Sequence, residues 1–285
     1  MADVCITEFT DPGCPWAFSA EPFRARLTWL YGDDLEWKVR LVGLAASPQD
    51  NEEKGLTAAK QAKAFAKIAR EHGMPIDTSE RPRTAATLPA CRAVVAARIH
   101  APERMRALLR SLRVRTFAGE LLDEPATIDA AAGDASIEPT DLRGWMDGED
   151  VARELDDDMA RAREPLPAAR ALDHKLANWS GGRRYTCPSY EVVRHADGVR
   201  IAVPGFQPFA AYDVVLANLM PGLERRDDPA SVAEVLEWAG TPLASKEVAV
   251  LCGLDVFEAR EQLGRVARER PVGADGYWSL SDRAI

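Results

Sequence analysis

Cysteine and histidine are scarce in this sequence, and it contains no long apolar run. Its five cysteines are an odd number without regular spacing, which excludes the paired disulfide framework of a small secreted protein. The four histidines show no metal-ligand spacing. No apolar run approaches the length of a membrane span, and Asp3 and Glu8 interrupt any apolar leader at the start. We therefore expect a cytoplasmic protein with no membrane partner.

Positive charge is also in short supply. The 36 lysines and arginines are outnumbered by 45 aspartates and glutamates, so the net charge is −9 at pH 7. A nucleic-acid-binding surface needs an excess of positive charge, and we expect no nucleic-acid partner. The remaining composition is that of an ordinary soluble protein, and 285 residues are enough for more than one structural unit.

The hydrophobic pattern divides the first 223 residues into strands at both ends and helices between them. Residues 1–50 and 179–223 carry the strands, expected at 4–9, 35–41, 190–194 and 199–203, and helices at 22–30 and 209–219. Residues 51–178 form a helical insertion, with helices expected at 58–71, 88–98, 102–116, 127–132, 141–145 and 151–163. The order is therefore β–α–β, a helical block, then β–β–α.

A charged break precedes a separate C-terminal unit, residues 229–285. Helices are expected at 232–238, 245–251 and 255–269, followed by a tight hairpin at 271–280. Three helices and a hairpin resemble a small winged-helix module. Its last helix alternates acidic and basic residues and has no basic face for DNA. We interpret the unit as a packing or dimerisation module, with a homodimer among the expected states.

The most informative absence concerns Cys14. This cysteine lies in Asp11-Pro12-Gly13-Cys14-Pro15-Trp16-Ala17, where the first strand gives way to a helix. A thiol at the first turn of a helix meets unpaired N–H groups and the positive end of the helix dipole, which favour the thiolate. Cys14 is therefore predicted to be a nucleophile. The second cysteine of a Cys-x-x-Cys pair is missing, because Ala17 stands in its place.

The order of elements resembles the thioredoxin-like fold in its DsbA-type form, which carries a large helical insertion. Residues 11–16 resemble the Asp-Pro-x-Cys-Pro-Trp-Cys motif of FrnE-type dithiol oxidoreductases, here in a degenerate Cys-Pro-Trp-Ala form. Residues 83–92 resemble the start of the family's first long insertion helix, and residues 117–123 resemble a later turn. The resemblance covers residues 3 to 222. It implies an α/β fold and thiol chemistry, and a related branch contains the 2-hydroxychromene-2-carboxylate isomerases.

The resemblance also places a cis-proline loop opposite the active cysteine. Thr186-Cys187-Pro188-Ser189 stands before the third strand, so Pro188 is the cis-proline candidate. The family has Val or Thr before this proline, whereas this chain has Cys187. Cys14 and Cys187 could cycle through a disulfide, could share a proton or a metal, or Cys187 could be an inert apolar wall. A metal is the least favoured alternative, since no His or carboxylate lies near Cys187 in the sequence.

Four further residues are candidates for contacting a substrate. Pro15 and Trp16 follow the thiol; Trp16 either offers a flat apolar surface beside it or packs in the core. Arg83 and Thr84 lie where insertion residues approach the active site in glutathione-using relatives, and a guanidinium there could pair with a carboxylate of a thiol cofactor. The simpler interpretation of Arg83 is a solvated arginine in a basic stretch with Arg81. Pro188 completes the predicted substrate-binding set.

Three functions follow from these predictions. The first is a cytoplasmic thiol-dependent oxidoreductase in which Cys14 forms a mixed disulfide that an external thiol, or Cys187, resolves. It needs no tightly bound cofactor and uses a low-molecular-weight thiol or disulfide as substrate or co-substrate. The second is an isomerase or transferase that depends on glutathione or another small thiol. The third is a non-catalytic binding or regulatory protein with a winged-helix module.

Overall fold

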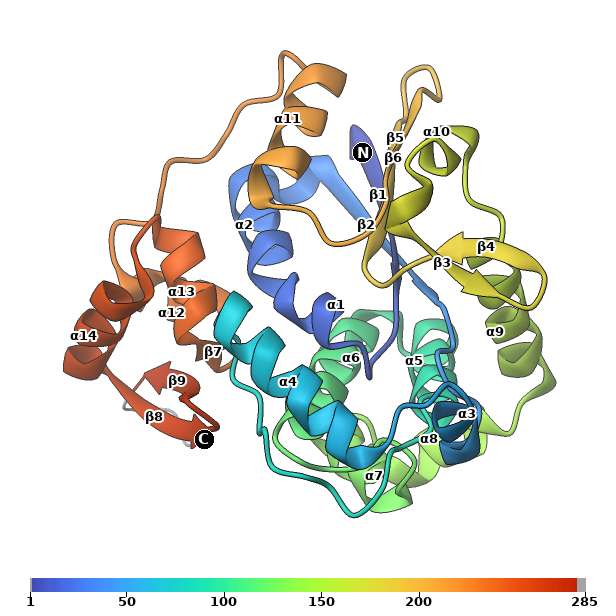
Figure 1. Cartoon of the computed structure of the whole chain (residues 1–285). Coiled ribbons are helices and arrows are strands. Elements are labelled where there is room, and N and C mark those ends of the chain that lie inside the picture. The colour runs from blue at the N-terminus through green and yellow to red at the C-terminus, as the bar shows by residue number, and fades with distance from the viewer. Residues whose placement is uncertain (1, 281–285) are drawn as a thin grey trace.

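The computed structural model describes residues 2–280 and has a four-stranded sheet at its centre (Figure 1). The strand order is β2-β1-β5-β6, formed by β2 (Leu35–Leu41), β1 (Val4–Thr10), β5 (Ser189–Arg194) and β6 (Arg200–Val203). β1 and β2 are parallel, while β5 pairs antiparallel with both β1 and β6. The predicted β–α–β and β–β–α units therefore share one sheet through β1 and β5.

Helices from both units cover the sheet. The parallel pair is connected through α1 (Pro15–Ser19), α2 (Glu21–Tyr31) and a 3₁₀ turn, Gly32–Asp34, as a parallel crossover requires. α11 (Phe209–Leu219) follows β6 and lies near α2 (Figure 1). Side chains of both helices and of the strands join one apolar cluster that includes Ile6, Leu30, Tyr190 and Leu216. Burial of this cluster stabilises the sheet.

The insertion consists of helices, as the sequence predicts. Its elements are α3 (Pro48–Glu53), α4 (Ala58–His72), α5 (Leu88–His100), α6 (Pro102–Phe117), α7 (Pro125–Asp134), α8 (Pro139–Met146), α9 (Glu149–Ala162) and α10 (Pro167–Arg170). α5 is rich in alanine and valine and is buried along most of its length, packed by α6, α8 and α9. The short helices α3 and α10 were not expected from the sequence.

A small hairpin between the insertion and β5 was also not expected. It is formed by β3 (Leu176–Trp179) and β4 (Gly182–Tyr185), which pair antiparallel and follow a 3₁₀ turn, Asp173–Lys175. The expected boundary between residues 178 and 179 therefore falls within β3. Each strand has only four residues, and neither alternates apolar with polar side chains, so no strand pattern marks it in the sequence.

The C-terminal unit combines three helices with a three-stranded sheet. Its elements are α12 (Val232–Ala239), β7 (Leu243–Ala244), α13 (Ser245–Cys252), α14 (Val256–Val266), β8 (Ala267–Val272) and β9 (Asp275–Leu280), with sheet order β7-β9-β8. The expectation of a helix continuing to residue 269 is wrong, because Arg268 and Glu269 pair with β9 as part of β8. The short strand β7 was missed.

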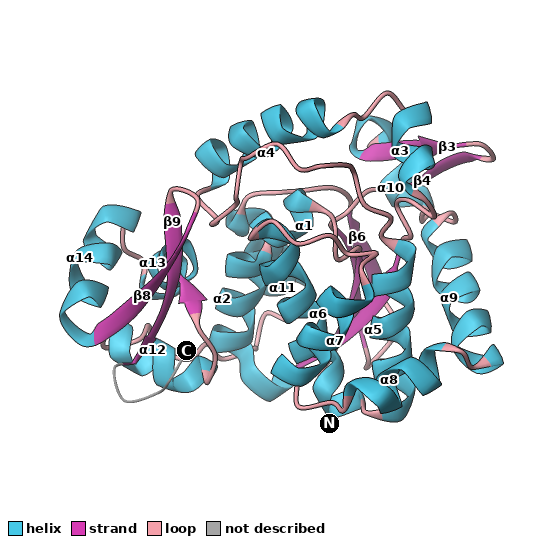
Figure 2. Cartoon of the chain, turned by 90° about the horizontal axis from the view of Figure 1, so that it is seen from below, coloured by secondary structure: helices cyan, strands magenta, loops and turns pink. Residues whose placement is uncertain are grey.

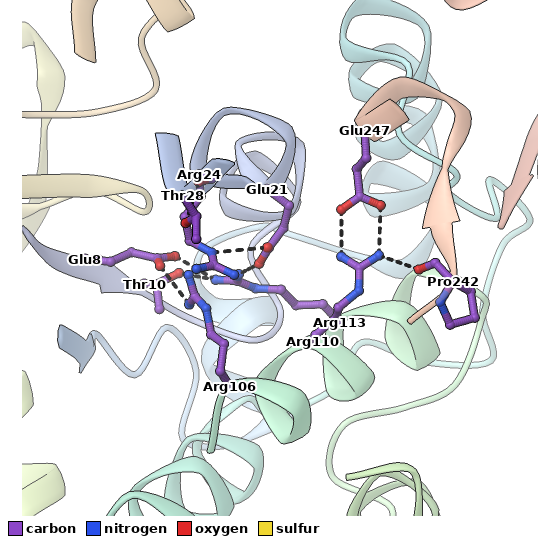
Figure 3. A network of polar contacts seen from close by, with 10 residues as sticks. All are labelled: Glu8, Thr10, Glu21, Arg24, Thr28, Arg106, Arg110, Arg113, Pro242 and Glu247. Carbon is purple, nitrogen blue, oxygen red and sulfur yellow. Dashed lines mark hydrogen bonds and ion pairs between the residues drawn. The ribbon is translucent and has the colours of Figure 1, made fainter. Parts of the chain in front are cut away.

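This unit packs against the rest of the chain on the side of α2. Figures 1 and 2 show α2 between its sheet and the central sheet. Arg110 of α6 makes two hydrogen bonds to the Glu247 carboxylate, of 2.7 and 2.8 Å, and a third of 2.8 Å to the Pro242 carbonyl oxygen (Figure 3). Tyr277 of β9 is buried in one cluster with Phe18 and Phe117. Among residues 2–280, no helix is both long and apolar enough to span a membrane.

Candidate thiol site

Cys14 occupies the N-terminal end of α1, as its sequence context predicts. The strand β1 ends at Thr10, and after the turn Asp11–Gly13 the residue Cys14 caps α1. Its side chain is 5 % exposed. The Sγ atom lies 3.2 Å from the carbonyl oxygen of Cys187, to which the protonated thiol donates a hydrogen bond. The backbone N–H groups of Trp16 and Ala17 also point to this sulfur.

Cys187 stands on the other side of the site, and the peptide bond from Cys187 to Pro188 is cis. Cys187 is 7 % exposed and, like Cys14, is a free thiol. Both cysteines belong to one buried cluster with Phe9 and Tyr185, whose rings stack at 4.4 Å. The structure therefore brings together the two cysteines that the sequence suggested as partners, although 173 positions separate them.

The two thiols have opposite tendencies to ionise. A hydrogen bond from the Cys187 thiol, supported by the N–H groups of Ala17 and Trp16, lowers the pKa of Cys14. These donors outweigh burial, the Cys187 carbonyl contact and the nearby charge of Asp11, which favour the protonated form. Burial, and then the Cys14 sulfur, raise the pKa of Cys187 well above its ordinary value. Of the two thiols, Cys14 is therefore the easier to ionise and Cys187 the harder.

Asp11 holds the turn that presents Cys14. Its carboxylate is fully buried, and one oxygen accepts a 2.8 Å hydrogen bond from the Gly13 N–H. The other oxygen accepts from the Leu44 N–H at 2.9 Å, from the Thr87 hydroxyl at 2.8 Å and from the Cys91 thiol at 3.4 Å. The Gly13 bond closes the turn, and the other three connect it to the segment after β2 and to the start of α5. The sequence marked Asp11 only as part of a motif, and this positioning role was missed.

The cis-proline loop is fixed from two directions. The Thr186 hydroxyl donates to the Lys175 carbonyl oxygen at 2.9 Å, at the base of the β3–β4 hairpin. The Ser189 hydroxyl donates to the Thr186 carbonyl oxygen at 2.8 Å and accepts from the Gly205 N–H at 2.9 Å. Gly205 has a positive φ of 69°, which favours glycine at this close approach. The β3–β4 hairpin and the loop after β6 together fix the position of Cys187.

Trp16 lies at the surface beside the thiol, so of the two alternatives core packing is wrong. Its side chain is 37 % exposed, and Pro15 next to it is partly exposed. The indole contacts the rings of His72 and Phe206 edge-on, with centroid distances of 4.9 and 5.6 Å. His72 ends α4 and Phe206 follows β6, so no local motif links either to Cys14. These two neighbours were missed for that reason.

Arg83 and Thr84 are engaged in contacts of their own. Arg83 forms ion pairs with Asp123 at 2.6 Å and with Glu124 at 2.5 Å, so two carboxylates already occupy its guanidinium. Thr84 is buried and its hydroxyl donates to the Pro48 carbonyl oxygen at 3.4 Å. Within residues 2–280, neither residue has a hydrogen bond or ion pair to either thiol. The structure thus does not bring the Arg83 guanidinium together with Cys14 and Cys187.

The simpler interpretation of Arg83, a solvated arginine, fits its half-exposed side chain, which nevertheless forms ion pairs. Its neighbour Arg81 is buried, with its guanidinium 5.0 Å from the Phe65 ring centroid, and it donates to the Thr116 carbonyl oxygen. Cys5 and Cys91 are buried as expected, while Cys252 is partly buried. Burial raises the pKa of all three thiols, to about 11 for Cys252. The raised pKa disfavours the thiolate form of all three cysteines.

A buried ionic network supports β1 just before the turn. Glu8 accepts from Arg106 at 2.9 Å and from Arg113 at 3.1 Å, and Arg113 also donates to Glu21 and Thr10 (Figure 3). Burial opposes ionisation of Glu8, but the charges of Arg106 and Arg113 hold its pKa at about 2. The network joins β1, α2 and α6. In the described part of the chain, no group of three or more His, Cys, Asp or Glu side chains could hold a metal ion.

Comparison with known proteins yields matches in structure only. No family model matches the sequence. No curated protein matches it either. A protein from Nitrosomonas europaea assigned as a protein disulfide isomerase has a TM-score of 0.55 at 17% identity, over 77% of this chain and 96% of that one. The cytosolic disulfide reductase DsbM from Pseudomonas aeruginosa has a TM-score of 0.54 at 16% identity, over 75% of this chain and 99% of that one. DsbM with GSH gives 0.52 at 16% identity, over 74% and 98%. With its central four-stranded sheet, helical insertion and cysteine at the start of α1, this chain has the DsbA-like form of the thioredoxin fold.

Proposed function

We propose that the protein is a thiol–disulfide oxidoreductase of the DsbA type that works with one nucleophilic cysteine, Cys14. The observation that carries the proposal is the pair of buried free thiols, in which Cys14 caps α1 and its Sγ atom lies 3.2 Å from the Cys187 carbonyl oxygen. The Cys187 thiol and two backbone N–H groups lower the pKa of Cys14, which favours its reaction as a nucleophile. The solved structures similar in fold include a disulfide reductase and an assigned disulfide isomerase, which supports the same chemistry. Because DsbM is cytosolic, we propose a cytoplasmic location as well.

The reaction is an exchange of sulfur–sulfur bonds. The Cys14 thiolate attacks one sulfur of a disulfide RS–SR′, a bond forms between Cys14 and the RS group, and R′S⁻ leaves with the electron pair of the broken bond. A second thiolate, from a low-molecular-weight thiol, then attacks the sulfur of the RS group. It releases the Cys14 thiolate and a new disulfide, so that the enzyme itself is unchanged in oxidation state.

Cys187 acts in this scheme as a hydrogen-bond donor to the Cys14 thiolate. Of the alternatives for the two cysteines, this is the sharing of a proton. Attack by Cys187 on the mixed disulfide would require its own thiolate, and burial raises the pKa of Cys187 well above its ordinary value. The external thiol, which ionises in water, is the more reactive nucleophile. Attack of Cys187 on the Cys14 mixed disulfide is the competing route, and an experiment has to distinguish it from attack by the external thiol.

The test exposes the full chain to oxidised glutathione and then maps every cysteine by peptide mass. We expect a glutathione adduct on Cys14 that persists until reduced glutathione is added, with Cys187 still a free thiol. Cys14→Ser should abolish both adduct and turnover, and the matched control Cys252→Ser should alter neither. A bridge between Cys14 and Cys187 would show that Cys187 resolves the adduct. Turnover that survives Cys14→Ser would overturn the proposal.

A second candidate is a transferase or isomerase that activates a bound small thiol. The observation in its favour is that the Trp16 and Ala17 N–H groups would stabilise a cofactor thiolate as well as that of Cys14. The structure of DsbM with GSH shows that a protein of this fold binds such a thiol. Under this alternative Cys14→Ser retains activity, because a serine hydroxyl still leaves the N–H groups free to hold the cofactor sulfur.

For the C-terminal unit we propose a packing role within this enzyme. Its element order, α–β–α–α–β–β, supports the winged-helix resemblance. Its contacts with the body of the chain, through Arg110 and Tyr277, support packing over nucleic-acid binding. Its acidic residues offset the basic ones on α14, where Arg265 pairs with Glu261.

A further inference from the structure

The β3–β4 hairpin brings two cationic side chains to the loop that carries Cys187. β4 ends at Tyr185, and Thr186 then leads to Cys187. Arg184 is in β4, and its Nη1 donates to the Tyr185 carbonyl oxygen at 2.7 Å, which holds the guanidinium beside the start of the loop. Its charge is close enough to act on the Cys187 thiol, whose pKa it lowers against the larger raising effect of burial.

Lys175 approaches the same loop from the other end of the hairpin. Its carbonyl oxygen accepts the hydrogen bond from the Thr186 hydroxyl. Its aliphatic stem passes close to Gly205, where a Cβ would lie 3.4 Å from both the Lys175 Cδ and the Thr186 Oγ1. Lys175 and Arg184 therefore flank the segment immediately before Cys187.

These two cations differ from Arg183, the other arginine of the hairpin, in having no carboxylate partner among residues 2–280. Arg183 forms an ion pair of 2.7 Å with Asp173 and bonds to Asn178. Arg184 and Lys175 are both partly exposed, and among residues 2–280 neither forms an ion pair. Within residues 2–280, therefore, no carboxylate neutralises the two cations nearest the Cys187 loop, and both charges are available to an anionic ligand.

We propose that Arg184 and Lys175 bind a carboxylate of the substrate and make the site selective for anionic thiols and disulfides. The inference rests on the proposed function, because it assigns a substrate class to the same thiol pair. It also gives Arg184 the role that the sequence suggested for Arg83. An arginine fork matches a carboxylate in geometry, and a second cation strengthens the attraction in a site partly shielded from water. The exposed ring of Trp16 can contact the apolar part of the same molecule.

The first test measures charge selectivity without requiring turnover. Cys14 is alkylated with iodoacetate, an anion, and with neutral iodoacetamide, and the two rates are followed by peptide mass. Because both reagents attack the same thiolate, their rate ratio reports the local potential. We expect Arg184→Gln and Lys175→Gln each to lower the iodoacetate-to-iodoacetamide ratio about threefold at low salt, and less at high salt. Arg265→Gln, which removes an exposed charge on α14, is the matched control and should leave the ratio unchanged.

The second test uses disulfide substrates of different charge. With oxidised glutathione, which is anionic, we expect Arg184→Gln to raise KM about tenfold or more with a small change in kcat, as loss of a bidentate ion pair implies. With neutral hydroxyethyl disulfide, the same variant should match the unsubstituted protein. An equal loss for both disulfides, or an unchanged alkylation ratio, would overturn the charge assignment. If the variants leave the iodoacetate-to-iodoacetamide ratio unchanged while the unsubstituted protein turns over disulfides, the charge assignment fails and the oxidoreductase proposal stands. If the ratio falls in the variants but the unsubstituted protein shows no turnover, only the oxidoreductase proposal is refuted.

Discussion

The sulfur of Cys14 lies 3.2 Å from the main-chain oxygen of Cys187, across the cis-proline loop. The second cysteine of the motif is missing, and Cys187, 173 positions away in the sequence, is the cysteine that lies next to Cys14 instead. This arrangement puts a thiol whose pKa is raised, Cys187, next to one whose pKa is lowered, Cys14. The chemistry of Cys14 therefore depends on the residue before Pro188 more than on the residue three positions after Cys14.

Removing the Cys187 thiol should make Cys14 harder to ionise. In Cys187→Ala the largest cause that lowers the pKa of Cys14 is lost. A hydrogen bond to a charged group contributes about 1.5 kcal/mol, so the thiolate fraction should fall about tenfold at neutral pH. The midpoint of the pH dependence of Cys14 alkylation then moves upward. Cys187→Ser keeps a hydrogen-bond donor, so its midpoint should lie between those of the unsubstituted protein and Cys187→Ala. An unmoved midpoint in Cys187→Ala would contradict the role of Cys187 as the donor to Cys14.

Restoring the second motif cysteine should convert the protein to a dithiol enzyme. Ala17 is 1 % exposed and lies three positions after Cys14, so the new thiol in Ala17→Cys can approach the Cys14 sulfur. After oxidation we expect a disulfide between Cys14 and the introduced cysteine, and a shorter-lived glutathione adduct, at a packing cost of about 1 kcal/mol. Peptide mapping and the unfolding midpoint measure both effects. Ala20→Cys, equally buried but outside the motif, is the control and should leave the adduct lifetime unchanged.

The Glu8 network should make the free energy of unfolding depend on pH in the acid range. The pKa of Glu8 is about 2 in the folded chain and 4.5 in a model peptide. The stabilisation is thus complete above pH 4.5 and is lost as the pH falls toward 2, with a total on the order of 3 kcal/mol. Denaturant unfolding at a series of pH values measures this dependence. Glu8→Gln should lose stability at neutral pH and flatten the profile, whereas Glu103→Gln, an exposed control, should do neither.

Breaking the ion pair of Arg110 and Glu247 should loosen the C-terminal unit. Arg110→Ala leaves the Glu247 carboxylate, 1 % exposed, without its charged partner, at a cost of about 3–5 kcal/mol. We expect faster proteolysis in the connecting segment 224–229. Adding Glu247→Gln to Arg110→Ala should recover part of the loss, since the amide oxygen can still accept from the Ala244 N–H. Arg104→Ala, an exposed change on the same helix, is the control; equal proteolysis of both variants would contradict this role.

Much of the fold could be predicted because its local patterns are strong. The alternation along β2 and the alanine- and valine-rich segment of α5 each specify an element without reference to the rest of the chain. The hairpin β3–β4 escaped prediction because its strands have four residues each and no alternation of apolar and polar residues. Its position is set by contacts such as the hydrogen bond from the Thr186 hydroxyl to the Lys175 carbonyl oxygen. The end of α14 at Val266 likewise depends on pairing of β8 with β9.

The sequence by itself determined the position of Cys14 at a helix start, and its resemblance to a known family supplied the fold class and Pro188 as the loop residue facing Cys14. Each of these depends on neighbouring residues or on the order of elements. Only the tertiary structure decided that Arg83 is occupied by Asp123 and Glu124, and that Arg184 is free of carboxylates in the described chain. The reason is physical: the reactivity of a thiol and the availability of a cation are set by donors, charges and burial within a few ångströms. Folding brings most of those groups from distant parts of the chain.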